Sequence, residues 1–165
     1  MDKHTAMERI VDSFHRYYDV NTEDPIKPFH VEAVYRGIDQ QYLLTKRARI
    51  FEVENYEYVY FYKTDRLTKA LYDELEDKAW TDGIGRTHPH SNHKSSDITL
   101  VIVAENVDSD CERIIKNTNR HVSHKFGFHG YSAFRLVVCD LSNGSILSNR
   151  RGSSLRRTVT NILNK

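Results

Sequence analysis

The sequence contains few cysteines, prolines and glycines and has no long hydrophobic run. Cys111 and Cys139 are the two cysteines among 165 residues, and they have neither CxxC spacing nor enough companions for a disulfide framework. The longest nearly apolar run, Ile98 to Ala104, is far shorter than the ~20 residues that a membrane-spanning helix needs. Three prolines and seven glycines exclude a collagen-like chain. We therefore expect a cytoplasmic protein with two buried thiols and no membrane association.

Charge is balanced in total but not along the chain. The 24 Lys and Arg residues and 23 Asp and Glu residues give a formal net charge of +1. A cut after Glu112 leaves 14 basic and 22 acidic residues before it, and 10 basic residues with one acidic residue, Asp140, after it. The two parts thus carry −8 and +9. This asymmetry indicates an anionic partner unless folding pairs the opposite charges with each other.

Hydrophobic periodicity predicts about four helices and a sheet. Helical spacing is found over residues 3–19, 66–80, from a Ser109–Glu112 capping box to about 122, and from 152–154 to the end. Apolar alternation or continuous β-branched sequence predicts strands at 29–37, 42–53, 56–63, 98–104, 131–141 and 145–149. A turn is expected at 37–41, and hairpin turns are expected at Glu54-Asn55 and, as a type I′ turn, at Asn143-Gly144.

These elements predict one α+β domain over residues 1–165, because no linker or low-complexity segment divides the chain. The expected order is αβββαβαββα. The sheet is expected to be mixed and mainly antiparallel, with an N-terminal three-stranded meander, a C-terminal hairpin and about four helices covering it.

A long loop is predicted at 81–97, and it holds His88, His90 and His93. Loops of more than about 12–15 residues often carry function. Neutral imidazoles bind zinc or nickel, and Asp97 could complete a ligand set. The alternative is that these are ordinary polar loop histidines, because their spacing matches no known hydrolytic motif. We expect no cofactor, and the metal alternative predicts a metal-dependent enzyme that uses zinc or nickel at His88, His90 and His93.

Tyrosines and arginines alternate on one side of the predicted middle hairpin. With a turn at 54–55, one surface carries Arg47, Arg49, Tyr56, Tyr58, Tyr60 and Tyr62. Tyrosine and arginine are enriched at protein interfaces, and they also stack with the bases of single-stranded nucleic acid. The opposite surface, with Val59 and Phe61, is expected to face the core. The alternative is that helices cover the tyrosines and that their hydroxyls find hydrogen-bond partners.

Cations cluster after residue 112, and some of them precede the last predicted helix. The start of that helix offers serine hydroxyls and free backbone N–H groups, which suit an anion. The predicted anion or nucleic-acid site comprises Lys116, Arg120, Arg150, Arg151, Arg156 and Arg157. No nucleotide-binding glycine pattern accompanies it, so ordinary helix capping with solvated arginines is the alternative.

No catalytic residue is identifiable, because neither cysteine nor any serine lies in a recognisable nucleophile motif. We therefore expect a small binding or protein-interaction module, with a protein partner or a second copy of the chain as its partner. Anion or nucleic-acid binding through the basic last third is the first alternative, and the metal-dependent enzyme is the second.

Overall fold

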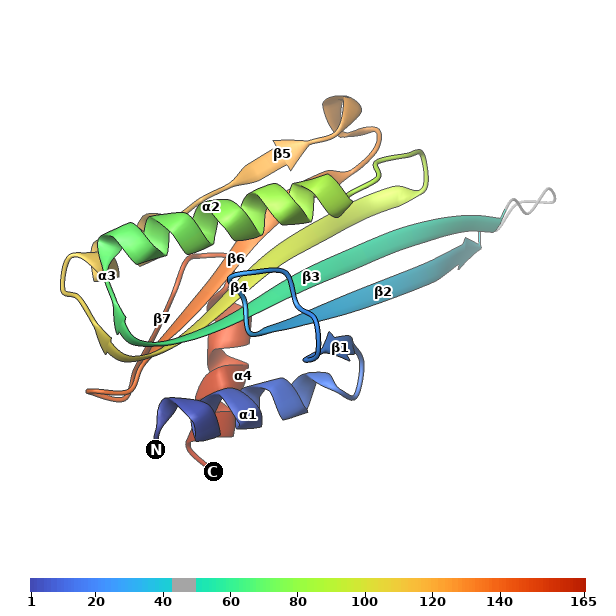
Figure 1. The fold of residues 1–165 in the computed structure, drawn as a ribbon. Helices are drawn as coiled ribbons and strands as arrows, with labels where there is room; N and C mark the ends of the chain where they lie inside the picture. The colour runs from blue at the N-terminus through green and yellow to red at the C-terminus, as the bar shows by residue number, and fades with distance from the viewer. Residues whose placement is uncertain (43–49) are drawn as a thin grey trace.

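The computed structural model describes the backbone of residues 1–42 and 50–165 and the side chains of residues 1–37 and 53–165. The described part is an α+β fold in which helices lie on both faces of one mixed sheet (Figure 1). Its helices are α1 (Lys3–Phe14), α2 (Lys69–Arg86), α3 (Cys111–Asn117), α4 (Ser153–Leu163) and the short 3-10 turn η1 (Lys125–Gly127). No described helix is long and apolar enough to cross a membrane.

Seven strands form the described sheet in the order β1-β2-β3-β4-β6-β5, with β7 also beside β6. They are β1 (Asp19–Asn21), β2 (Val31–Tyr42), β3 (Ile50–Leu67), β4 (His93–Val107), β5 (His121–Ser123), β6 (Tyr131–Asp140) and β7 (Ser145–Ser148). The three central strands, β3, β4 and β6, are parallel, and the other pairings are antiparallel. The predicted mixed sheet and four helices are therefore confirmed, but β1 and β5 were not expected, and the two strands expected at 42–53 and 56–63 are replaced by the single strand β3.

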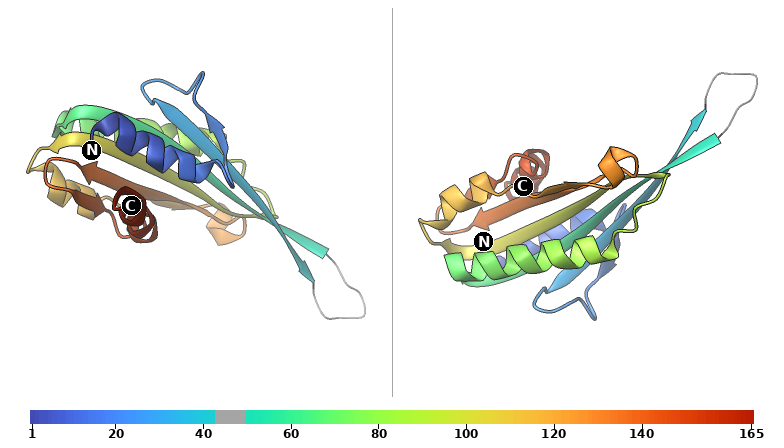
Figure 2. Two further views of the ribbon diagram at one scale, coloured as in Figure 1. Left: turned by 90° about the horizontal axis from the view of Figure 1, so that it is seen from below. Right: turned by 90° about the horizontal axis from the view of Figure 1, so that it is seen from above.

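Two hydrophobic cores lie on opposite faces of the sheet. Figure 2 shows α1 and α4 over one face and α2 over the other. Under α2 and α3 are buried residues such as Tyr60, Leu100 and Phe134. Under α1 and α4 lie the residues that alternate with these along the same strands, such as Phe61 and Val101. Because the central strands are covered on both faces, the continuous apolar run 98–104 is buried throughout, as predicted.

The predicted three-stranded meander over residues 29–63 is wrong, because the described residues 50–53 of the expected second strand and the expected third strand at 56–63 form one strand, β3. The three antiparallel strands at this side of the sheet are instead β1, β2 and β3. The expected turns at 37–41 and 54–55 lie within one long ladder, where Gly37 pairs with Asn55 and Tyr42 pairs with Ile50. Cross-strand hydrogen bonding along twelve residue pairs outweighs the local turn preference of Gly37 and Asn55. Residues 50–53 of β3, which precede Glu54, do not pair with β4. In this part β2 and β3 form a two-stranded ribbon that extends past the rest of the sheet in Figure 2.

Helix α2 is longer than predicted, so the expected loop at 81–97 shrinks to residues 87–92. The helix begins after Thr68, whose hydroxyl accepts the Leu71 N–H, rather than at the predicted residue 66. It continues through Gly83, where an added Cβ would lie 2.6 Å from the Ile98 side chain. Gly83 thus lets α2 approach β4 closely, and this tertiary contact outweighs the low helix propensity of glycine.

Helix α3 is shorter than predicted and ends at Asn117. Its N-cap is Asp110, without a side-chain capping bond, so the expected capping box is not formed. Val122 lies in strand β5, because the segment after α3 pairs with the edge of β6. Lys116, Arg120 and His124 therefore do not share a helix face.

The C-terminal hairpin between β6 and β7 is confirmed, but its turn is not of type I′. Asp140 pairs with Ser145, so residues 141–144 form a four-residue connection. Gly144 has a φ of +72°, whereas Asn143 is not among the described residues with positive φ. A type I′ turn needs positive φ at both central positions.

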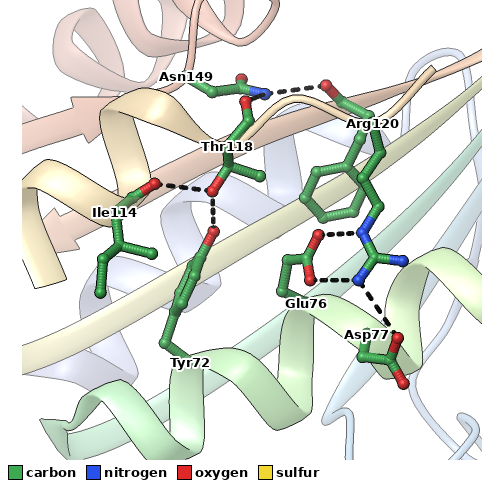
Figure 3. Close-up of polar contacts among 8 residues, drawn as sticks. Tyr72, Glu76, Asp77, Ile114, Thr118, Arg120 and Asn149 are labelled. Atoms are coloured by element: carbon green, nitrogen blue, oxygen red, sulfur yellow. Dashed lines mark hydrogen bonds and ion pairs between the residues drawn. The ribbon is translucent and has the colours of Figure 1, made fainter.

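Asn149 joins three parts of the chain through four hydrogen bonds. Its Oδ1 accepts the backbone N–H groups of Leu136 (3.0 Å) and Gly152 (2.9 Å). Its Nδ2 donates to the carbonyls of Thr118 (3.1 Å) and Phe134 (2.9 Å). The side chain therefore ties β6 to the segment after α3 and to the start of α4, and part of this network is shown in Figure 3.

Folding pairs some of the late cations with early acids, which was the alternative to an anionic partner. Arg120 holds Glu76 through two hydrogen bonds of 2.5 and 2.8 Å and also reaches Asp77 (Figure 3). Lys116 pairs with Glu112 one turn earlier in its own helix. Cys111 and Cys139 are both buried and free, as expected.

Candidate functional site

Charged side chains interrupt the apolar sheet face that α1 and α4 cover. Glu57 of β3, Asp97 of β4 and Arg135 of β6 lie on the three central parallel strands. Farther along the same face the strands carry apolar side chains such as Val59 and Val137. Charges on central strands are costly unless they are paired, so their grouping marks this part of the sheet as a candidate site.

Arg135 lies between the two carboxylates. Its guanidinium is 2.6 Å from Asp97 and 3.5 Å from Glu57. Glu57 also accepts hydrogen bonds from the hydroxyls of Tyr18 at 2.5 Å and Thr99 at 2.7 Å. Burial raises the pKa of Asp97, while the charge of Arg135 opposes this shift. Burial and the neighbouring Glu57 carboxylate together raise the pKa of Tyr18, which keeps its proton.

A cavity of about 330 Å³ opens above this network, between the end of α1 and the first turns of α4. We call it the central cleft, and its lining residues are Ser13, Phe14, Tyr18, Glu57, Arg135, Arg151, Ser154, Leu155 and Thr158. Within the described residues, Arg151 forms no ion pair, in contrast to Arg135. Arg151 also lies close enough to lower the pKa of Asp97. The cleft therefore offers one uncommitted cation and several hydroxyls near the N-terminus of α4.

The six cations of the predicted anion site do not converge. Lys116 and Arg120 belong to the side of the sheet that carries α2 and α3, and acids neutralise both. Arg156 and Arg157 line a separate shallow cavity beside Gly144. Arg150 is exposed and lines none of the described cavities. The remaining member, Arg151, is the one that reaches the central cleft.

His90 is already engaged in hydrogen bonds at both ring nitrogens. Its Nδ1 accepts the Asn92 N–H at 3.2 Å, so its Nε2 carries the proton and donates to Glu54 at 2.9 Å. A neutral imidazole used in this way has no lone pair left for a metal. His88 is exposed and lines a cavity together with His90.

His93 is buried and likewise uses both ring nitrogens. Its Nδ1 donates to the His129 carbonyl at 2.6 Å, and its Nε2 therefore accepts from the Ser96 hydroxyl at 2.8 Å. Across residues 1–37 and 53–165, no group of three or more His, Cys, Asp or Glu side chains is placed to hold a metal. The structure thus does not assemble His88, His90 and His93 into a ligand set.

The predicted tyrosine face is covered by α2, which was the stated alternative. Tyr58 and Tyr60 are buried, with 9% and 0% of their surface exposed. The Tyr60 hydroxyl donates to Asp82 at 2.5 Å, and the Tyr58 hydroxyl donates to the Arg86 carbonyl at 3.3 Å. Tyr56 and Tyr62 are half-buried at the margin of this core. The expected exposure is therefore wrong for Tyr58 and Tyr60, whereas Arg47 and Arg49 lie outside the described residues.

Residues 2–161 match the family model described as "Domain of unknown function (DUF8052)". The chain belongs to this family. No curated protein and no solved structure matches the chain. The family description assigns no activity, so the function has to be argued from the geometry of the central cleft and its surroundings.

The sequence pattern did not predict the central cleft, although the position of one carboxylate, Glu57, points to it. Glu57 has the same strand parity as Val59 and Phe61, so it falls on the surface that was expected to face the core. A carboxylate at a core-facing position needs partners that other segments supply. The sequence does not show that Asp97 and Arg135 are those neighbours, because strand order brings them together.

Proposed function

We propose that this domain is a non-catalytic binding module whose central cleft holds a small ligand by an anionic group. The observation that supports this proposal is the position of Arg151, a cation without an ion-pair partner in the described chain, at a cavity beside the first turn of α4. The Ser154 and Thr158 residues line the same wall. No acidic residue occurs from 141 to 165, so the α4 side of the cleft is favourable for an anion.

A small anion fits this arrangement better than an extended polyanion. Arg135 already neutralises the carboxylates on the cleft floor, and Arg151 is left as a single point of attachment. The other cations of the predicted site are distributed over separate surfaces. The proposal includes no cofactor, no membrane association and a cytoplasmic location, with nucleic acid as the macromolecular alternative.

We expect inorganic phosphate to bind saturably to the protein. Arg151→Ala should weaken this binding about tenfold or more, because it removes one charge-assisted hydrogen bond. Isothermal titration at two salt concentrations measures it, and the affinity should fall as salt screens the charge. Arg113→Ala is the matched control, because Arg113 is an exposed cation on α3, a helix that packs on the opposite face. Absence of saturable binding, or equal binding by the Arg151 variant, would contradict the proposal.

A protein-interaction function is the second candidate, and the loop at 124–130 favours it. This phenylalanine loop exposes 98% of Phe126 and 78% of Phe128. Lys125 and Phe126 have positive φ values of 47° and 54°, a strained backbone for these residue types. The hydrogen bond from His93 to the His129 carbonyl holds the loop against β4. Exposed apolar side chains on a fixed, strained loop are typical of contact surfaces.

For this candidate we expect concentration-dependent self-association, since no acid lies between Glu112 and Asp140 while the exposed side of α2 is acidic. Sedimentation velocity of the protein should show dimers that dissociate at high salt. The double substitution Phe126→Ser and Phe128→Ser should shift the dimer equilibrium by about tenfold or more toward monomer, with an unchanged melting temperature. A monomer at every protein and salt concentration would rule out self-association.

A further inference from the structure

A second cavity, of about 510 Å³, lies on the α2 side of the sheet, at the C-terminal end of α2. We call it the tyrosine pocket. Tyr56 and Tyr58 of β3 line it, and their rings stand parallel, with an interplanar angle of 2° and centroids 6.4 Å apart. Gly85 lines its α2 side, where an added Cβ would meet nothing within 4 Å. The pocket therefore combines aromatic walls with unfilled space, and it is of the size that small-molecule sites have.

Two of the lining residues, Tyr56 and His90, are held in position by Glu54. Glu54 accepts the hydroxyl of Tyr56 at 2.8 Å and the Nε2–H of His90 at 2.9 Å. The hydrogen bond from Tyr56 has the larger effect, and together the two bonds lower the pKa of Glu54, which favours its ionised form. The carboxylate is thus already satisfied by two donors, and it fixes the orientation of one aromatic wall.

Two side chains that can bind an anion line the tyrosine pocket without a partner in the described residues. Arg36 and His88 line the pocket, and neither side chain makes a hydrogen bond or ion pair within residues 1–37 and 53–165. The charge of Arg36 acts on both phenols, since it opposes the rise of their pKa values. Arg86 also lines the pocket, but Glu32 and Asp82 neutralise it.

We propose that the tyrosine pocket binds a planar aromatic ligand that carries an anionic group, as a nucleoside monophosphate does. The ring lies against Tyr56 and Tyr58, and Arg36 and His88 bind the anionic group. The two tyrosine rings and Arg36, which all line the pocket, provide both contacts without any change in the intramolecular ion pairs. This site is on the other side of the sheet from the central cleft and does not depend on it.

Titration of the protein with adenosine 5′-monophosphate tests this inference. We expect saturable binding, with adenosine and inorganic phosphate each binding at least about tenfold more weakly at this site because each lacks one of the two contacts. Gly85→Leu places a side chain in the open space and should abolish the binding. Leucine has a higher helix propensity than glycine, so α2 should be retained, which circular dichroism and the melting temperature check. Arg36→Ala should weaken binding about tenfold.

Two further variants separate this site from the central cleft. Arg113→Ala, the matched loss of an exposed cation, and Arg151→Ala should both leave binding of adenosine 5′-monophosphate at the tyrosine pocket unchanged, even if Arg151→Ala removes a separate, weaker phosphate-dependent event at the central cleft. The inference is overturned if the nucleotide does not bind saturably, if adenosine binds as tightly as the nucleotide, or if Gly85→Leu binds it like the wild type. It is equally overturned if Arg151→Ala, rather than Arg36→Ala, removes the binding, since the ligand would then occupy the central cleft.

Discussion

Asn149→Ala is expected to destabilise the folded protein by about 4 kcal/mol, because it leaves the Leu136 N–H and the carbonyls of Thr118 and Phe134 without this partner and leaves the Gly152 N–H with the Asn149 carbonyl alone. The alanine side chain can neither accept the N–H groups of Leu136 and Gly152 nor donate to the carbonyls of Thr118 and Phe134. The Asn149 side chain is 2% exposed, so water does not readily replace it. Urea unfolding followed by circular dichroism measures the loss as a lower midpoint.

The geometry around Asn149 explains why the neighbouring chain cannot adjust to the loss. An added Cβ at Gly152 would lie 2.3 Å from the Leu136 carbonyl oxygen, so the start of α4 is closely packed on β6. Asn161→Ala is the matched control, because Asn161 is exposed on the same helix. That variant should stay within about 0.5 kcal/mol of the wild type. A loss below about 1 kcal/mol for Asn149→Ala would show that its hydrogen bonds contribute little to folding.

Arg135→Ala is expected to cost about 2–3 kcal/mol at pH 7, since it leaves Glu57 and Asp97 facing each other without the cation between them. This loss is below the ~3–5 kcal/mol expected for breaking a fully buried ion pair, because 36% of the Arg135 side chain is exposed and solvent screens its charge. Thermal or urea unfolding measures the loss. The double variant Arg135→Ala with Asp97→Asn should be less destabilised than Arg135→Ala alone, because it removes one of the two unpaired carboxylates.

The effect of Arg135→Ala should depend on pH in a definite direction. Burial raises the pKa of Asp97 above that of the unfolded chain, so the folded state binds this proton more tightly. The stability gained from that proton is present at low pH and is lost as the pH rises through the raised pKa. Removing Arg135 raises the pKa further. The difference in free energy of unfolding between Arg135→Ala and the wild type should therefore become smaller as the pH falls from 7 toward about 5. A difference that does not change with pH would contradict this account.

Local patterns predicted the elements whose packing agrees with their own sequence. The spacing of Met7, Ile10 and Phe14 predicted α1, and all three are buried as expected. The β-branched run 98–104 predicted a strand covered on both faces, because no residue within it, on either face of the strand, is charged. Asn143-Gly144 predicted a hairpin, and Gly144 supplies the positive φ at its turn.

Long-range pairing decided the features that local patterns predicted wrongly. Gly37, Asn55 and Gly83 each favour a break in regular structure, yet all three lie inside a strand or helix. In the first two cases a continuous cross-strand ladder supplies the backbone hydrogen bonds, and in the third the small glycine fits against Ile98. Such contacts join residues far apart in the sequence, so no local preference reports them.

Residue pattern and composition were enough to predict an α+β fold with four helices, buried thiols and opposite charges in the two parts of the chain. Where those charges meet depends on the packing of strands and helices. Strand order brings Arg135 to Asp97 and Glu57, and helix packing brings Arg120 to Glu76. The same packing also leaves Arg36 and Arg151 without ion-pair partners in the described chain, each at a different cavity. Charge is a property of single residues, whereas pairing requires two side chains in contact, which only the fold provides.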